Sequence, residues 1–322
     1  MSQSRPMSIA LIVSLIVLGG PPPRGHAAEP VDVAARAKEL FRRDNLVAWC
    51  IVPFDAKKRG PEERAAMLEK LDLKHFAYDW RKEHIPTFDE EWDALAKHGV
   101  ALDAFWATPP DLPQLLESFR RRGLTPSFWV MAGAPADLDQ AAKVKHAADR
   151  LRPLAETVAK AGCRVSIYNH GGWGGEPENM VAVCEELKMP NVGIVYNQHH
   201  GHDHLPRFAE SLATMLPHLH FLNLNGMMAE GDKKGQKIMV LGQGDLDVDL
   251  ARIICESSYS GPIGILNHTG HDAEARLLDN LAGLDWITGE LTGKPIPKPT
   301  PRTKEREQRI ARPMALPQAS PD

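Results

Sequence analysis

The sequence has few cysteines and few aromatic residues. Only 4 of its 322 residues are cysteine, at positions 50, 163, 184 and 255, and no two of them form a Cys-x-x-Cys pair. The aromatic fraction is 6%. This scatter excludes the disulfide framework of a small secreted scaffold. We therefore expect four buried free thiols.

The chain also lacks clustered positive charge. It has 38 Lys and Arg against 42 Asp and Glu, for a formal net charge of −4. Proteins that bind nucleic acids need Lys and Arg gathered on one surface to neutralise phosphates. The composition therefore argues against nucleic acid as a partner, and against a nuclease.

Long apolar runs are missing except near the N-terminus. Residues 9–20 form an apolar run of 12 residues, preceded by Arg5 and followed by Pro, Gly and the stretch RGHAAEP. A membrane span needs about 20 apolar residues, whereas this layout is typical of a secretory signal peptide. We predict a signal peptide over residues 1–28 and a periplasmic or secreted protein that leaves the membrane after cleavage. An uncleaved N-terminal anchor is the alternative.

Between residues 31 and 292, β-prone apolar segments alternate with amphipathic helical segments. A first helix is predicted over residues 31–45, and eight strand–helix pairs follow it. The strands are predicted within 45–55, 74–80, 101–108, 125–132, 163–170, 191–198, 218–226 and 261–268. Such alternation predicts parallel strands covered by helices. Eight units over roughly 250 residues fit one α/β domain, a closed (β/α)8 TIM barrel.

An open, doubly wound sheet is the alternative fold. It is disfavoured because no Gly-rich dinucleotide fingerprint follows the first strand. Residues 293–322 are rich in Pro and charge and poor in apolar side chains. That composition predicts a disordered tail.

Polar and aromatic side chains gather at the predicted carboxyl ends of the strands, where the active sites of such barrels lie. The stretch SIYNHGGWGGEPENM, residues 166–180, combines an Asn-His pair with four glycines that let the backbone turn sharply. The predicted ligand-binding residues are Asp79, Trp106, Tyr168, Asn169, Trp173, Asn197, Asn223, Asn225 and Asn267. Amides bind hydroxyl groups, and aromatic faces pack on the C–H faces of sugars. We therefore expect a small polyhydroxylated ligand.

His170, His200 and Glu176 are the predicted catalytic residues. Histidine carries protons near neutral pH, and both histidines follow predicted strands. Glu176 lies at the start of a helix, where an acid can also serve the helix alone. Asp55 and Asp79 are further acid–base candidates, although for Asp79 we expect a structural ion pair with Arg81.

The stretch NQHHGHDH, residues 197–204, contains four histidines. Neutral imidazole is a common metal ligand, and a metal site built on His170, His199 and His200 is an open alternative. Adjacent histidines on one segment do not all face one ion. We therefore assign no metal ligand and no certain cofactor.

Several segments resemble the xylose-isomerase-like barrels, a family of sugar-phosphate isomerases and epimerases. YNHGG is similar to the family's Glu-Asn-His-Gly-Gly motif, NQHH to its Asp-x-x-His motif, and VLGQGDLDV to its Gly-Glu-Gly-Asp loop. FLNLNG and GPIGILN resemble its seventh and eighth strands. The resemblance covers most of residues 46–290. It implies a TIM barrel that isomerises or epimerises a sugar or keto-sugar.

In that family a Glu, an Asp, a His and a second Glu hold a divalent metal. The corresponding positions in this sequence are Tyr168, Asn197, Asn223 and Asn267. A carboxamide offers a hard cation only a carbonyl dipole where a carboxylate offers a full charge. We therefore expect the divalent metal site to be weakened or absent. A non-catalytic carbohydrate-binding barrel is the alternative function.

Overall fold

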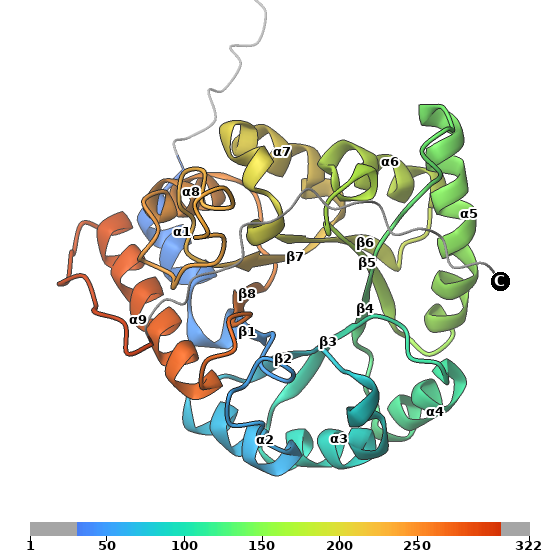
Figure 1. Cartoon of the computed structure of the whole chain (residues 1–322), viewed down its shortest axis with the longest axis horizontal. Helices are drawn as coiled ribbons and strands as arrows, with labels where there is room; N and C mark the ends of the chain where they lie inside the picture. Colours follow the sequence, from blue (N-terminus) through green and yellow to red (C-terminus); the bar gives the residue numbers. More distant parts are fainter. Residues whose placement is uncertain (1–30, 304–322) are drawn as a thin grey trace, which may run out of the picture. The chain divides into compact units, whose positions relative to one another are not determined.

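The computed structural model describes residues 31–303, in which eight parallel strands close into a barrel in chain order. Helices surround the strands, which confirms the predicted fold (Figure 1). The strands are β1 (Leu46–Trp49), β2 (His75–Tyr78), β3 (Ala101–Trp106), β4 (Ser127–Val130), β5 (Arg164–Tyr168), β6 (Val192–Asn197), β7 (Leu219–Leu224) and β8 (Ile263–Leu266). The α-helices are α1 (Val33–Leu40), α2 (Pro61–Lys70), α3 (Phe88–Lys97), α4 (Leu112–Arg122), α5 (Gln140–Ala159), α6 (Pro177–Leu187), α7 (Phe208–Met215), α8 (Asp247–Glu256) and α9 (Ala273–Leu291).

Local sequence signals set the ends of several helices. Pro61 begins α2, where a missing N–H costs nothing. The Asp139 carboxylate caps α5 by accepting from the N–H of Ala142 at 2.8 Å. Gly123 ends α4 in a left-handed conformation with φ 68°, which glycine adopts without steric cost.

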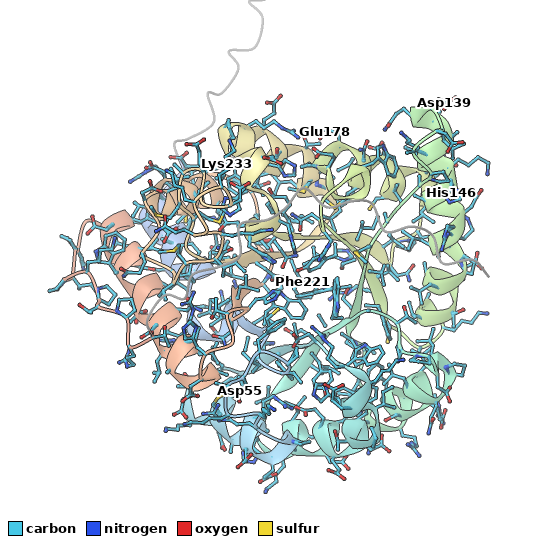
Figure 2. The ribbon with its side chains drawn as sticks, in the orientation of Figure 1. Asp55, Asp139, His146, Glu178, Phe221 and Lys233 are labelled. Atoms are coloured by element: carbon cyan, nitrogen blue, oxygen red, sulfur yellow. The ribbon has the colours of Figure 1, made fainter. Side chains whose placement is uncertain are left out.

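Side chains on the strands alternate between the barrel interior and the layer beneath the helices. The interior cluster contains Trp49, Trp129, Tyr168 and Phe221. The rings of Trp49 and Trp129 lie 4.6 Å apart, and those of Trp129 and Phe221 lie 5.2 Å apart. Phe221 occupies the centre of the ring of strands (Figure 2). The barrel interior is therefore packed, and each buried aromatic side chain contributes roughly 1.5–3 kcal/mol.

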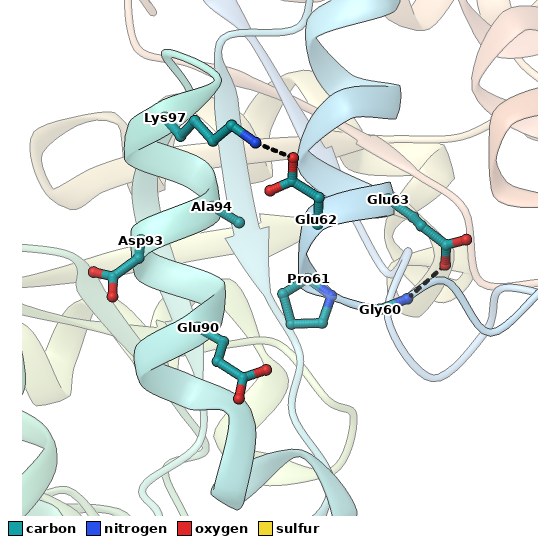
Figure 3. Close-up of a pocket in the computed structure, with 8 residues that line it drawn as sticks. All are labelled: Gly60, Pro61, Glu62, Glu63, Glu90, Asp93, Ala94 and Lys97. Atoms are coloured by element: carbon teal, nitrogen blue, oxygen red, sulfur yellow. Dashed lines mark hydrogen bonds and ion pairs between the residues drawn. The ribbon is translucent and has the colours of Figure 1, made fainter.

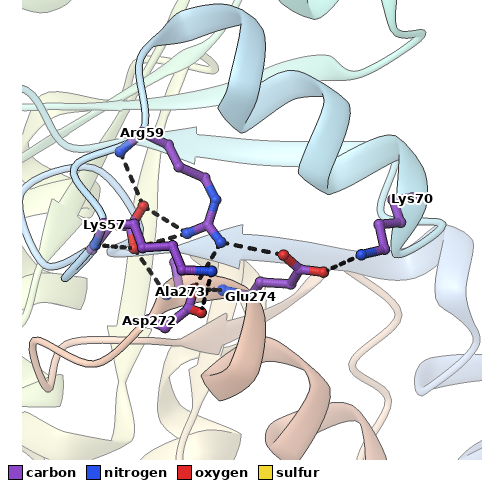
Figure 4. A network of polar contacts seen from close by, with 7 residues as sticks. Lys57, Arg59, Lys70, Asp272, Ala273 and Glu274 are labelled. Atoms are coloured by element: carbon purple, nitrogen blue, oxygen red, sulfur yellow. Dashed lines mark hydrogen bonds and ion pairs between the residues drawn. The ribbon is translucent and has the colours of Figure 1, made fainter.

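A buried ionic network joins the β1–α2 loop to the start of α9 (Figure 4). Nη1 of Arg59 lies 2.9 Å from Oδ1 and from Oδ2 of Asp55, and its Nη2 lies 2.8 Å from Oδ1 of Asp272. Burial opposes ionisation of Asp55, but the N–H of Ala273 and the guanidinium of Arg59 outweigh it and lower its pKa. Asp55, a sequence candidate for acid–base chemistry, therefore closes the seam between the first and last barrel units.

Residues 293–303 pack on the barrel, so they are not the disordered segment that their composition predicts. The buried Asp279 carboxylate on α9 accepts from the N–H of Arg302 at 2.9 Å, and from the N–H and Oγ1 of Thr303 at 2.8 and 2.7 Å. Nζ of Lys298 lies 4.8 Å from the centre of the Trp286 ring. The rest of the predicted tail lies outside the described residues.

Two further expectations concern cysteine and the membrane. All four cysteines are buried free thiols, as predicted. Between residues 31 and 303, every helix is too short or too polar to span a bilayer. The predicted signal peptide, residues 1–28, lies outside the described residues.

Asp279→Asn tests the docking of residues 293–303. The amide replaces an acceptor oxygen by a donor facing the N–H groups of Arg302 and Thr303. We expect the free energy of unfolding to fall by about 1–3 kcal/mol, measured by urea denaturation. Glu290→Gln removes one exposed carboxylate from the same helix and serves as the control. Equal stability of the two variants would contradict the assigned contacts.

Candidate functional site

The candidate site is the opening at the carboxyl ends of the strands, here called the mouth. We define it by partly exposed side chains that come from seven different strand ends or loops. They are Phe54, Arg81, Trp106, His170, His200, Lys237 and His268. Three of them were predicted as site residues from the sequence: Trp106, His170 and His200.

Aromatic and imidazole rings line the mouth in a continuous series. The rings of Trp106 and Tyr168 lie 4.4 Å apart, as do those of His170 and His200. His199 lies below His200, with 3.8 Å between ring centres. The structure thus brings His170 and His200, from the ends of β5 and β6, into direct contact.

Three of the predicted amides form a buried chain beneath the mouth. The N–H of Asn197 donates to Oδ1 of Asn169 at 2.7 Å, and Nδ2 of Asn169 returns a bond to the carbonyl of Asn197 at 3.0 Å. Nδ2 of Asn223 donates to Oδ1 of Asn197 at 2.7 Å. Because all three are almost fully buried, they tie the ends of β5, β6 and β7 together. They are not on the surface that a ligand meets first.

Tyr168 and Asn267 differ in how they face the barrel. Tyr168 points inward and is 4% exposed, with its ring against Trp49 and Trp106. On β8 it is Leu266 that joins the interior cluster, and Asn267 is the next residue along. Leu266 therefore occupies the interior position at the end of β8. The position that the resemblance assigned to the family's second glutamate is Leu266 and not Asn267.

Asn225 and Asn267 each have a buried amide with an unsatisfied group. Nδ2 of Asn225 donates to the carbonyl of Gly226 at 2.8 Å, but its Oδ1 has no hydrogen-bond partner within residues 31–303. Neither amide atom of Asn267 has one in that range. Both ring nitrogens of the buried His199 also have no hydrogen-bond partner within residues 31–303. Buried polar groups of this kind call for a water or ligand partner.

Two predicted site residues do not reach the mouth. Oε2 of Glu176 lies 3.2 Å from Nε2 of His204 and 3.1 Å from Nη2 of Arg207, in the outer layer between α6 and α7. Trp173 packs against the outer core, and its Nε1 donates to Oε1 of Gln140 at 2.8 Å. Glu176 is therefore an ion-pair partner at a helix start, which was the alternative interpretation of its position.

Asp79 is the predicted carboxylate that does face the interior. It is 2% exposed, and neither carboxylate oxygen has a hydrogen-bond partner among the described residues. Burial raises the pKa of Asp79 to about 7, although the Arg81 charge and the nearby N–H of Val52 act in the opposite direction. Arg81 makes no ion pair with it within residues 31–303, so the expected Asp79–Arg81 pair does not form. Cys50 beside it has a left-handed φ of 60°, a strained conformation of the kind that clusters at functional sites.

Lys237 is a residue that the sequence did not single out. It lies in the long loop between β7 and α8, in which Gly226 and Met239 pair in an antiparallel bridge. Nε2 of His202 donates to the Lys237 carbonyl at 2.9 Å, and the adjacent Ile238 joins the interior cluster. The Asp247 carboxylate holds the end of this loop by accepting three backbone N–H bonds of 2.7–3.0 Å.

The histidines of the mouth are held neutral. Burial, then His170 and Lys237, lowers the pKa of His200 to about 2. Burial and Arg81 lower the pKa of His268 to about 4. Burial and Lys237 also lower the pKa of His170, which is less enclosed. At pH 7 these imidazoles can each accept or donate one hydrogen bond without carrying charge.

The residues at the interior strand ends do not fit the divalent metal that the fold family implies. Tyr168, Asn197, Asn223 and Leu266 offer no carboxylate where a hard cation needs one. The side-chain amides of Asn197 and Asn223 are also hydrogen-bonded to each other. Within residues 31–303 no three His, Cys, Asp or Glu side chains are grouped to hold a metal ion, and this includes the alternative based on His170, His199 and His200.

A separate cavity of about 460 Å³ lies on the outer surface between α2 and α3 (Figure 3). Acidic side chains dominate its lining, and Lys97 pairs with one of them, Glu62. It lies outside the ring of strands. It is a groove between helices rather than part of the mouth.

Comparison with known proteins places this geometry in context. A sequence profile described as "Xylose isomerase-like TIM barrel" matches residues 113–287. Comparison with curated proteins gave no match. Similar solved structures include the probable 3-DHS dehydratase AsbF from Bacillus anthracis, with 14% identity, a TM-score of 0.58, and coverage of 76% of this chain and 98% of that one.

Two other similar structures are sugar epimerases by name. The 3-keto-D-glucoside 4-epimerase YcjR from E. coli has 14% identity and a TM-score of 0.56, over 76% of this chain and 98% of that one. A D-allulose 3-epimerase from Methylomonas sp., in complex with D-allulose, has 14% identity and a TM-score of 0.53, over 79% and 95%. Identities this low establish only the shared fold. Since the profile match spans more than half of the sequence, the chain belongs to the xylose isomerase-like TIM barrel family.

Proposed function

We propose that this protein isomerises or epimerises a sugar or keto-sugar at the mouth, by histidine-mediated proton transfer in place of a carboxylate-held metal. The observation that carries the proposal is the contact between His170 and His200, whose ring centres lie 4.4 Å apart. The similar structures named as epimerases and a dehydratase support a sugar-modifying role.

The two histidines are suited to different tasks. His170 is the less enclosed of the two, so its pKa stays nearer neutrality and makes it the better general base. It removes the proton from the carbon next to the substrate carbonyl, and the electron pair of that C–H bond moves to form an enediolate. His200, neutral because of burial, donates a hydrogen bond to the developing oxyanion. Return of that proton from His170 to the neighbouring carbon gives an isomer, whereas protonation of the opposite face by water, with His170 then releasing its proton to solvent, gives an epimer.

Trp106 in the mouth and several buried residues behind it position the sugar. The partly exposed Trp106 offers an aromatic face for the C–H groups of a sugar ring. The unsatisfied amide oxygen of Asn225 and the nitrogens of His199 lie behind this surface as partners for ligand hydroxyls or for water. Asp79 adds a carboxyl group that exchanges its proton near neutral pH.

Export is part of the proposal. Arg5, the apolar run of residues 9–20 and the small residues at 27 and 28 support a cleaved signal peptide. An intact mass of the mature protein that begins after residue 27 or 28 would support it. A full-length mass in the membrane fraction would favour the N-terminal anchor instead.

His170→Gln and His200→Gln test the catalytic assignment. On any sugar or keto-sugar that a panel of substrates shows to be converted, we expect each variant to lose roughly 10²–10⁴-fold in kcat, measured by product analysis. His218→Gln, at the opposite end of the barrel beside β7, is the matched control and should keep full activity.

Full activity in both mouth variants would overturn the assignment. Sugar-dependent stabilisation of the wild type without any turnover would instead favour the alternative of a non-catalytic carbohydrate-binding barrel. Thermal denaturation of each variant shows whether a lost activity reflects lost folding.

Asp79→Asn tests whether the buried carboxylate is kept at a cost in stability. The folded pKa of Asp79 is raised from about 3.8 to about 7. Between these pH values the folded state keeps a proton that the unfolded state releases, so stability falls as pH rises and the full cost is present above pH 7. At pH 8 we expect Asp79→Asn to have a higher free energy of unfolding than wild type, by up to about 4 kcal/mol. At pH 4 the two proteins should be nearly equally stable.

Urea denaturation across this pH range measures the effect. Glu90→Gln on the exposed face of α3 is the control and should track the wild type at every pH. A variant Asp79→Asn that is less stable than wild type at pH 8 would mean that the charged form stabilises the fold.

A further inference from the structure

Residues 293–303, here called the strap, run back along α9 after that helix ends. Their successive contacts move from the end of α9 toward its start: Lys294 on Gly289, Lys298 on Trp286, and Arg302 and Thr303 on Asp279. Because α9 begins just after the carboxyl end of β8, this direction leads the strap toward the mouth end of the barrel.

The strap meets the tip of the loop between β7 and α8. Nε2 of Gln243 in this tip donates to the carbonyl of Pro299 at 3.0 Å. From the other side, Oδ1 of Asn280 on α9 accepts from the N–H of Leu241 at 3.1 Å. The Leu241 carbonyl also lies so close to Gly283 that a Cβ at position 283 would have no room. The tip of the loop is therefore held between α9 and the strap.

The same loop reaches the interior of the barrel a few residues before its tip. Ile238 is 7% exposed and belongs to the interior cluster. The Lys237 carbonyl accepts a hydrogen bond of 2.9 Å from Nε2 of His202, which follows β6. Between Ile238 and the tip, Met239 pairs with Gly226 in the antiparallel bridge. The strap and the interior cluster are thus joined by one continuous series of contacts.

The attachment of the strap is of a kind that can be released. Prolines at positions 295, 297, 299 and 301 have no N–H to donate, so the strap cannot form a continuous ladder of backbone hydrogen bonds. It is fastened instead by the separate contacts at Gly289, Trp286, Gln243 and Asp279. A segment held by few hydrogen bonds opens at a lower free energy than the core of a domain.

We propose that the strap is a releasable clamp that holds the β7–α8 loop against the interior ends of the strands, so that release of the strap frees the loop and opens this side of the mouth. The clamp is a regulatory device that goes beyond the proposed reaction. Its effect on turnover rests on the proposed function, whereas the coupling between strap and loop does not.

Hydrogen exchange of the full chain, followed by mass spectrometry, tests this coupling. In Asp279→Asn we expect the strap and the loop amides of residues 239–244 to exchange together, roughly three- to tenfold faster than in wild type. Gln243→Leu should accelerate the same loop amides to a similar extent. Amides of α5, on another side of the barrel, should keep their wild-type rates.

The double variant Asp279→Asn/Gln243→Leu separates coupled from independent effects. If the strap acts on the loop through Gln243, loop exchange in the double variant is no faster than in the faster single variant. Glu290→Gln on α9 and Gln236→Leu in the loop are the matched controls and should exchange like wild type. The side chain of Gln236 makes no hydrogen bond within residues 31–303.

Three results would overturn the clamp. The first is faster exchange of the strap with an unchanged loop in Asp279→Asn. The second is multiplication of the two effects in the double variant, which would make strap and loop independent. The third is uniform acceleration that includes α5, which would mean that the variants loosen the whole barrel. The measurement needs no substrate, so its failure is distinguishable from failure of the proposed reaction.

Discussion

The absence of carboxylates at the interior ends of β5, β6, β7 and β8 is the constraint on which the account of this barrel depends. Where the family resemblance implies a Glu, an Asp, a His and a second Glu, this chain has Tyr168, Asn197, Asn223 and Leu266. The two asparagines bond to each other, and Tyr168 packs into an aromatic interior. Without those negative charges, neither a divalent cation nor a charged histidine is stabilised there. Neutral imidazoles and the buried carboxyl group of Asp79 are what remain to act on a ligand.

This arrangement concentrates energetic cost at the mouth. Asp79, His199 and Lys237 are each removed from water, wholly or in part, without a compensating partner among the described residues. Cys50 adds backbone strain beside Asp79. The rest of the barrel offsets these costs through its packed interior, the Asp55–Arg59 network and the Asp279 contacts. Such a distribution is expected of a site that trades stability for function.

The fold was predictable because residue type and spacing indicate the alternation of strands and helices. The end of the barrel that carries the site followed from topology, since active sites in such barrels lie at the carboxyl ends of the strands. The site was predictable only to the level of the strand ends. His170, His200 and Trp106 reach the mouth, whereas Asn169 ties β5 to β6 and Trp173 and Glu176 join the outer layer. Which residue faces inward depends on where each strand ends, and sequence does not fix that boundary to one residue. Lys237 was missed because it lies in a loop, where the sequence has no periodicity that would indicate its position. The Gly-rich stretch that ends at Asp247 was the sequence feature that pointed to an ordered loop here.

The most direct measurement of the central claim is a titration of the metal-free protein with Mn²⁺, followed by electron paramagnetic resonance and combined with an assay in the presence of chelator. The account predicts no saturable Mn²⁺ site at the mouth and turnover that chelator does not change. Binding of one Mn²⁺ per chain at micromolar concentration, lost in Asp79→Asn or His170→Gln and required for turnover, would contradict it.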